Sequence, residues 1–198
     1  DLIHDGLVLA DFDGDGALDV VTVGRYANSI GEPGRLSVYR NSGDGTLAPP
    51  DDLSLPERAW AVCAADLRGD DALDLAVLLD GPSLPANTSA VLILSNDGSG
   101  GFLPTTTLQV PAPGRHVVAG DVDADGDADL VAACGTELVV LLNNGVSGFA
   151  AWTVAKAPEG WWYDHALLDD IDADGALDLI AARHTLFWSG SLGGNEAS

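Results

Sequence analysis

The chain has 198 residues, of which 46% are apolar, and this is enough for one domain with a hydrophobic core. Asp and Glu outnumber Lys and Arg 31 to 8, which gives a formal net charge of −23. This charge argues against nucleic acid or an anionic membrane surface as a partner. No apolar run reaches the roughly 18 residues of a membrane span, so we expect no membrane insertion.

An acidic stretch of nine residues recurs along the chain. Its copies are loop 1 (DFDGDGALD, 11–19), loop 2 (DLRGDDALD, 66–74), loop 3 (DVDADGDAD, 121–129) and loop 4 (DIDADGALD, 170–178). They begin about 50 residues apart, and a fixed period in this range indicates a solenoid or a propeller array.

Short apolar runs flank every loop and are predicted to be strands. One precedes the loop (LVLAD, VCAAD, VVAGD, ALLDD), a second follows it (DVVTVG, DLAVLL, DLVAAC, DLIAAR), and a third comes next (LSVYRN, AVLILSN, LVVLLNN, TLFWSG). The third run leads into a Gly-rich turn, and a fourth strand is expected around 53–55, 106–110 and 152–154. Runs bounded by Gly, Asn and Asp are typical of hairpins, and no segment has a sustained helical period.

Four strands per repeat make one propeller blade, so the sequence predicts an all-β fold, a β-propeller of four blades. In a single domain covering 1–198 the blades would span about 1–58, 59–113, 114–161 and 162–198. The last blade is expected to be incomplete, with three strands, because the tail GGNEAS is too polar and Gly-rich to be a strand. Its edge favours a homo-oligomer or a strand-supplying partner; a closed four-blade monomer is the alternative.

The loops are predicted to bind metal. Asp side chains at positions 1, 3 and 5 converge when the backbone curls, and Gly at position 6 permits positive φ. Position 7 can add a backbone carbonyl, and Asp at position 9 closes the cage. Oxygen ligands without His or Cys favour Ca²⁺ over zinc, copper or Mg²⁺. We expect three Ca²⁺ sites, with the ligands Asp11, Asp13, Asp15, Ala17 and Asp19; Asp121, Asp123, Asp125, Asp127 and Asp129; and Asp170, Asp172, Asp174, Ala176 and Asp178.

Two alternatives to this metal cage fit the sequence less well. An EF-hand would need Glu at position 12, where the four loops have Thr or apolar residues. Asx-turns without metal would explain one loop, but four copies at blade spacing argue against them.

Loop 2 differs from the other three loops. Arg68 replaces the carboxylate at position 3, and Asp71 replaces the Gly at position 6. We expect the Arg68 guanidinium to neutralise one or more of the remaining carboxylates, so that this fourth site is empty or filled by Arg68. The carboxylates of this weaker site are Asp66, Asp70 and Asp74.

The D-x-D-x-D-G-x-x-D loop between two strands, with a turn close to N-x-G-x-G-x-F downstream, resembles the FG-GAP and VCBS repeats. The resemblance extends from about Leu7 to Gly194. It implies a calcium-binding β-propeller like those of integrin α-subunits, certain fungal lectins and many secreted bacterial proteins. It also implies an extracellular location, secreted or at the cell surface, where millimolar Ca²⁺ can fill modest sites.

The function predicted for this scaffold is binding of a glycan or a protein. The candidate surface consists of the loops that lead into the first strand of each blade. Aromatic rings there could stack on sugars and polar groups could bind hydroxyls, from Trp60, His116, Trp161, Trp162, Tyr163, Asp164 and His165. The alternative for Trp60 and Trp162 is packing between blades, and for the histidines a conformational role.

Two other functions are compatible with the sequence. The chain could be a structural or assembly element, whose blade edges bind other chains. A polysaccharide-active lyase or hydrolase is least favoured, because the sequence has no nucleophile elbow or zinc signature. Cys63 and Cys134 lie in apolar runs and are interpreted as small buried side chains, with a disulfide as the alternative.

Overall fold

The computed structural model describes residues 2–26, 33–145 and 148–185. Within these ranges the fold is all-β, as predicted, and no helix is long and apolar enough to cross a membrane. The fourteen strands are β1 (Leu2–Ala10), β2 (Asp19–Tyr26), β3 (Arg35–Tyr39), β4 (Asp51–Ser54), β5 (Arg58–Ala65), β6 (Asp74–Asp80), β7 (Thr88–Asn96), β8 (Phe102–Pro111), β9 (Gly114–Gly120), β10 (Asp129–Cys134), β11 (Glu137–Asn143), β12 (Phe149–Lys156), β13 (Trp161–Asp169) and β14 (Asp178–Thr185).

The strands form antiparallel blades in chain order. The first three sheets have the orders β1-β2-β3-β4, β5-β6-β7-β8 and β9-β10-β11-β12, and the fourth contains β13-β14. The fourth strands expected around 53–55, 106–110 and 152–154 are confirmed as β4, β8 and β12. The expected third strand of the last blade, residues 185–190, lies almost entirely outside the described residues, so a three-stranded final blade stays a prediction.

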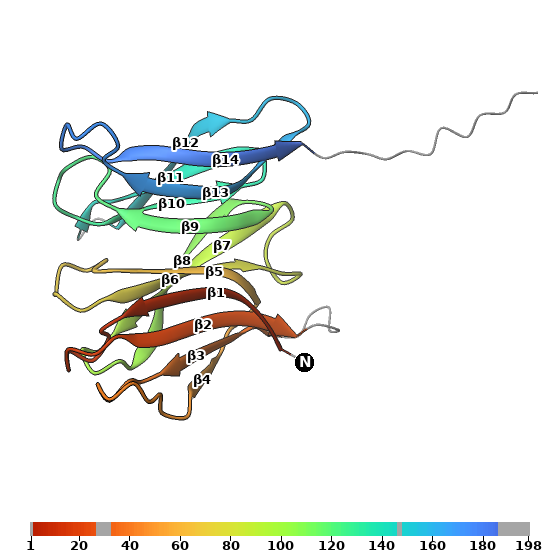
Figure 1. Ribbon diagram of the computed structural model, residues 1–198. Coiled ribbons are helices and arrows are strands. Elements are labelled where there is room, and N and C mark those ends of the chain that lie inside the picture. The colour runs from red at the N-terminus through yellow and green to blue at the C-terminus, as the bar shows by residue number, and fades with distance from the viewer. Residues whose placement is uncertain (1, 27–32, 146–147, 186–198) are drawn as a thin grey trace, which may run out of the picture.

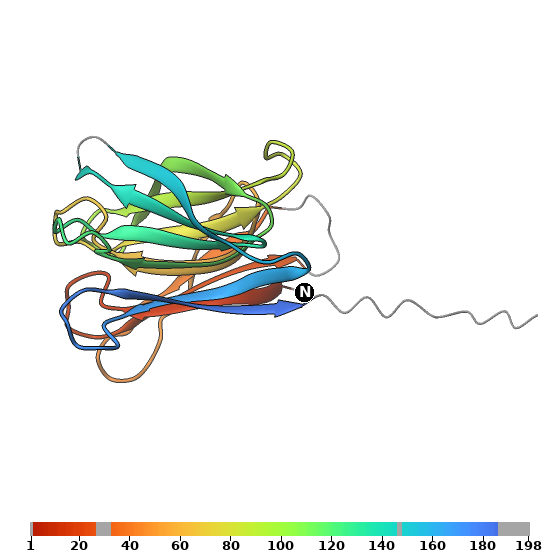
Figure 2. The same ribbon diagram turned by 90° about the horizontal axis from the view of Figure 1, so that it is seen from above.

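The four sheets are stacked on one another (Figure 1), with the first strands β1, β5, β9 and β13 side by side along one face. The view from above places the outer strands on the opposite side of the stack (Figure 2). The acidic loops, which join the first strand of each blade to the second, therefore all lie at one end of the array. The segments that lead into the first strands lie at the other end.

The hydrophobic core consists of three clusters, one between each pair of successive blades. Strand β6 shows how a strand serves two of them. Leu75, Val77 and Leu79 pack in the cluster shared with the first blade, and Ala76 and Leu78 pack in the cluster shared with the third. Both faces of a central blade are therefore buried, which explains why its inner strands are nearly all apolar.

An Asn at the end of the third strand links neighbouring blades. The side-chain Nδ2 of Asn143 donates to the carbonyl of Ala128 in its own blade (3.1 Å) and to that of Leu67 in the preceding blade (2.9 Å). Asn96 makes the same pair of bonds to its own blade and to the carbonyl of Phe12. Asn41 donates to Leu18 of its own blade.

The two cysteines are free thiols. Cys134 is buried and Cys63 is half-buried, and both pack in the cluster between the second and third blades. Burial raises the pKa of each thiol to about 12. Their interpretation as small buried side chains is confirmed for Cys134, whereas Cys63 is only half-buried.

We predict that the bond between blades makes Asn143 more important for stability than Asn41. Asn143→Ala leaves a buried carbonyl of the preceding blade without a donor and should lower the free energy of unfolding by about 1–3 kcal/mol. Asn41→Ala is the matched control, because both side chains also accept the N–H of the Gly two residues on. Urea unfolding measures both, and equal losses would contradict the role between blades.

Candidate functional site

The first carboxylate of each acidic loop organises the backbone. Asp11 accepts the N–H groups of Gly14 (2.8 Å) and Gly16 (2.9 Å) through its two oxygens. Asp121 and Asp170 accept N–H groups from positions 5 and 6 of their loops in the same way. The loop therefore curls around its first side chain, as an Asx-type turn does.

Position 6 of each loop requires a left-handed backbone. Gly16, Gly126 and Gly175 have φ of +89°, +97° and +92°, and Asp71 has φ of +64° at this position in loop 2. Glycine adopts these values without strain, whereas an L side chain does not. The expected role of Gly at position 6 is confirmed, and loop 2 keeps the same curl with a strained residue.

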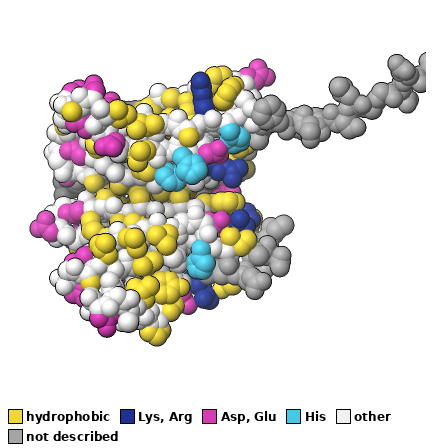
Figure 3. Space-filling view, in the orientation of Figure 1, with side chains coloured by type: hydrophobic (Ala, Val, Ile, Leu, Met, Phe, Trp, Pro, Cys, Tyr) yellow, Lys and Arg dark blue, Asp and Glu magenta, His cyan; other side chains and the backbone are white. Residues whose placement is uncertain are grey.

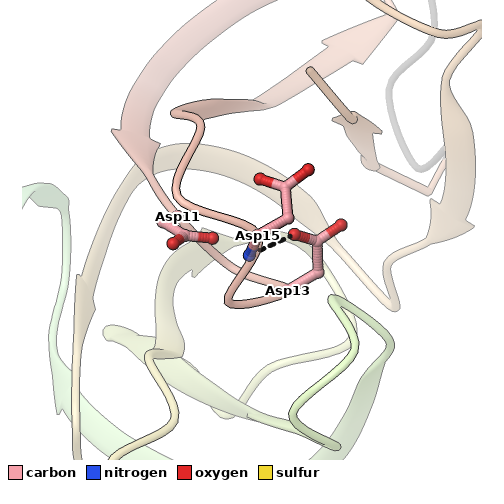
Figure 4. Close-up of side chains that lie close together, drawn as sticks. All are labelled: Asp11, Asp13 and Asp15. Carbon is pink, nitrogen blue, oxygen red and sulfur yellow. Dashed lines mark hydrogen bonds between the residues drawn. The ribbon is translucent and has the colours of Figure 1, made fainter. Parts of the chain in front are cut away.

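Three of the loops bring carboxylates together. In each group, one oxygen from every member lies within 4.8 Å of the others, and the groups are Asp11, Asp13 and Asp15; Asp121, Asp123 and Asp129; and Asp170, Asp172 and Asp178. Figure 4 shows the loop 1 carboxylates gathered around the turn, with the N–H of Asp15 donating to Asp13 (3.2 Å). Further residues predicted as ligands lie outside these groups, namely Asp19, Asp125, Asp127 and Asp174.

The carboxylate at position 9 is buried in the first three blades. Asp19, Asp74 and Asp129 are 0% exposed. Asp129 accepts the N–H of Val122 (2.8 Å) and the N–H of Asn143 (2.7 Å). This residue therefore anchors the loop to the third strand, and Asp129 can do so while offering an oxygen to the loop 3 group.

The carboxylates of loop 3 repel one another. Desolvation and the nearby carboxylates of Asp125 and Asp129 raise the pKa of Asp123 above its ordinary value. A bound cation would relieve this repulsion. The donor set contains only hard oxygen atoms, which fits Ca²⁺.

The Arg68 guanidinium fills the corresponding space in loop 2. Its Nε lies 3.3 Å from both oxygens of buried Asp74, and its Nη2 lies 2.8 Å from Asp70 and donates to the Asn96 carbonyl (2.7 Å). The hydrogen bond to Asp74 raises the pKa of Arg68. The arginine thus pairs with two of its three predicted partners, while Asp66 accepts backbone N–H groups.

The predicted ligand-binding residues lie at the other end of the strands. The first strand of each blade contains a β-bulge there, and the extra residue is Asp5, Trp60, Arg115 and Asp164 in the four blades. Bulges re-aim side chains near functional sites. The sequence-predicted residues Trp60 and Asp164 are thus equivalent positions in their repeats.

Arginine side chains cover several of the tryptophan rings. The Cζ of Arg25 lies 4.6 Å from the centroid of Trp60, and that of Arg115 lies 5.6 Å from it. Arg115 also lies 6.0 Å from the centroid of Trp162. Trp161 has the corresponding contact with the Arg183 guanidinium, at 5.0 Å. The faces of these tryptophan rings are therefore in contact with guanidinium groups, which they bind through cation–π interactions.

The remaining predicted residues have mixed environments. Tyr163 is buried in the core between the third and fourth blades. The rings of His116 and His165 lie 5.0 Å apart, and burial together with the nearby His165 lowers the pKa of His116. The Asp164 carboxylate contacts Nδ1 of His184.

Sequence reasoning missed the arginines at this end. Arg25, Arg58, Arg115 and Arg183 make up half of the eight basic residues, and all four histidines occur in the same segments. Figure 3 shows the histidines on the right-hand half of this face, with Arg or Lys beside them. The signal was available, since these residues all lie where a first strand begins or a second strand ends.

Comparison with known proteins supports the architecture. No curated protein sequence matches the chain. A solved lectin structure from Agrocybe aegerita is similar, with a TM-score of 0.52 and 24% identity over 87% of this chain. The alignment covers 45% of the lectin, so this chain spans less than half of its length. At this identity the similarity shows a shared fold.

The sequence model of the FG-GAP-like repeat matches three times, at residues 11–77, 83–132 and 121–181. These matches cover most of the chain and include every acidic loop. The curled loops, the blades and the repeat spacing thus agree, and the chain belongs to the FG-GAP-like repeat family.

Proposed function

We propose that this chain is a calcium-stabilised, extracellular β-propeller module that binds a glycan or a protein. The three groups of gathered carboxylates carry the calcium part of this proposal. In loop 3, for example, Asp121, Asp123 and Asp129 would hold the ion, and Ala17 and Ala176 would add carbonyl oxygens in loops 1 and 4. Calcium supplies a divalent charge where the chain's own carboxylates repel.

Calcium would act as a brace of the fold. Each loop joins the first two strands of a blade, and in the first three blades position 9 also anchors it to the segment that follows or ends the third strand. Three ions would add six positive charges to a formal −23 where the repulsion is strongest. Sites of this kind in extracellular modules have dissociation constants of about 10⁻⁴–10⁻³ M, so they fill outside the cell.

Two observations support a binding role. The Agrocybe aegerita lectin of similar fold is described as recognising non-reducing terminal N-acetylglucosamine. In this chain, Arg, His and Trp side chains gather at the end of the array opposite the acidic loops. A glycan array probed with and without EGTA tests the role, and calcium-dependent retention of saccharides is the expected result.

We predict that calcium raises the midpoint of thermal unfolding, because it binds the folded loops and not the unfolded chain. Calorimetry of the whole chain should show three ions bound. Asp123→Ala should remove one of them, and Glu159→Ala, which removes an exposed carboxylate outside the loops, should remove none. A midpoint unaffected by both calcium and EGTA would contradict the proposal.

Loop 2 offers a gain-of-function prediction. Arg68→Asp together with Asp71→Gly restores the carboxylate at position 3 and an unstrained residue at position 6. Calorimetry should then show one more calcium ion than in the natural chain. Without calcium the double variant should be less stable, because buried Asp74 loses its ion pair. Unchanged stoichiometry would show that the loop 2 backbone does not suit the ion.

Assembly with a second copy is the other candidate function, and one loop position favours it. At position 2, Phe12 and Leu67 are 2% and 5% exposed, because they pack against the next blade. Ile171 occupies this position in loop 4 and is 64% exposed.

The outer face of the first blade, at the opposite end of the stack, also exposes apolar side chains. Leu7 and Leu9 of β1 are 60% and 53% exposed, whereas Val62, the counterpart of Leu7 in β5, is 8% exposed. Each terminal face thus presents apolar side chains that a neighbouring blade buries elsewhere, and the two faces of two copies would complement one another.

We predict that the chain self-associates head to tail through these faces. Light scattering should detect a species larger than 20.3 kDa whose proportion rises with concentration. Ile171→Asp should shift the equilibrium to the monomer, since it places a charge in the contact. Ser99→Asp, which adds the same charge on an exposed hairpin of a central blade, is the control. A strictly monomeric natural chain would overturn this candidate.

A further inference from the structure

The two ends of the blade array differ in charge. The acidic loops hold 17 of the 31 acidic residues at one end. The opposite end has Arg25, Arg58, Arg115 and Arg183 together with all four histidines. In a chain of net charge −23, composition alone would not predict such a concentration of basic side chains at one end.

These basic side chains are connected across the blades. Asp5 pairs with Arg25 (3.0 Å), whose guanidinium lies over one side of the Trp60 ring. Arg115 is also within cation–π distance of this ring and of Trp162 in the fourth blade. Arg115 therefore lies between two aromatic rings, and those rings hold its guanidinium in place.

Most basic side chains of the described residues have a carboxylate partner. The exceptions are Arg58, Arg115 and Arg183, which have no carboxylate oxygen of a described residue within 4.0 Å, and all three lie at this end. The Nε atoms of Arg58 and Arg115 and the indole N–H of Trp60 are buried without a hydrogen-bond partner. Buried donors of this kind are rare unless a ligand or ordered water satisfies them.

We propose that Arg115, supported by Trp60 and Trp162, binds the carboxylate of an acidic saccharide at this end of the array. This inference rests on the proposed glycan-binding function and names its ligand class. A guanidinium presents a planar fork of donors that matches a carboxylate. The nearby His165 and the Asp164–His184 pair offer donors and acceptors for the hydroxyl groups of the sugar ring.

The overall charge restricts the ligand further. A long polyanion such as nucleic acid would be repelled by the rest of the chain, whereas a short saccharide with one or a few carboxylates contacts only the basic end. Covered tryptophan faces also argue that recognition depends on the guanidinium rather than on sugar stacking at Trp60. Uronates and sialates share the required chemistry.

Calorimetry on the calcium-loaded chain tests this with matched probes. Trigalacturonate and 3′-sialyllactose are each compared with the methyl ester of the same saccharide, so that each pair differs in the carboxylate charge. We expect at least one acid to bind about tenfold or more tightly than its neutral counterpart, and added sodium chloride to weaken it. Which acid binds distinguishes a uronate from a sialate ligand.

Arg115→Gln should weaken binding of that acid by about tenfold or more, because it removes a charged donor. Arg35→Gln is the control, since Arg35 pairs with Asp52 on the outer strands of the first blade. Arg115→Lys keeps the charge and should retain part of the affinity. It serves as the second variant if Arg115→Gln folds poorly. A thermal melt of each variant shows whether the fold is intact.

Three other outcomes would overturn the inference, and they show whether the proposed glycan function fails with it. Equal binding of acids and neutral counterparts would remove the carboxylate preference and leave glycan binding standing. Acid-selective binding unaffected in a folded Arg115→Gln variant would place the site elsewhere. No binding of any saccharide, here and on the glycan array, would overturn both this inference and the proposed glycan function.

Discussion

The blade depends on a buried carboxylate at the last position of its acidic loop. Asp19 begins β2 and accepts the N–H of Phe12 from the loop (3.1 Å) and the N–H of Asn41, two residues after β3 (2.8 Å). One side chain thus joins the ends of three strands, and a charged acceptor makes these bonds stronger than neutral ones. Hydrogen bonds within the protein therefore set the curl and the orientation of the loop without a bound ion.

The Asn that ends the third strand also connects its blade to the preceding blade. Asn96 and Asn143 donate across the blade boundary to the carbonyl at position 2 of the preceding loop, and the apolar side chain at that position packs beneath. Phe12 meets the ring of Phe102 edge-on, with centroids 5.4 Å apart. The acidic loop is therefore both a candidate metal cage and a joint between blades, so a change in one affects the other.

This arrangement leaves the two ends of the first strands with different tasks. At the end with the acidic loops, backbone N–H groups and carboxylates hydrogen-bond to one another and stabilise the fold. At the bulge end, the residue that each blade contributes is free to vary, and it is Asp5, Trp60, Arg115 and Asp164 in turn. A repeated scaffold with one variable position per blade is suited to recognition.

The sequence by itself determined the blades, the curled loops and the family, because strand alternation, Gly at position 6 and the repeat spacing are local signals. It also indicated that Arg68 would neutralise loop 2, since the arginine stands at a ligand position. Only the tertiary structure decided which carboxylates converge and what the tryptophans contact. Arg115 lies about 50 residues from Trp60 and from Trp162 along the chain, and no local pattern shows that packing between blades places a guanidinium between their rings.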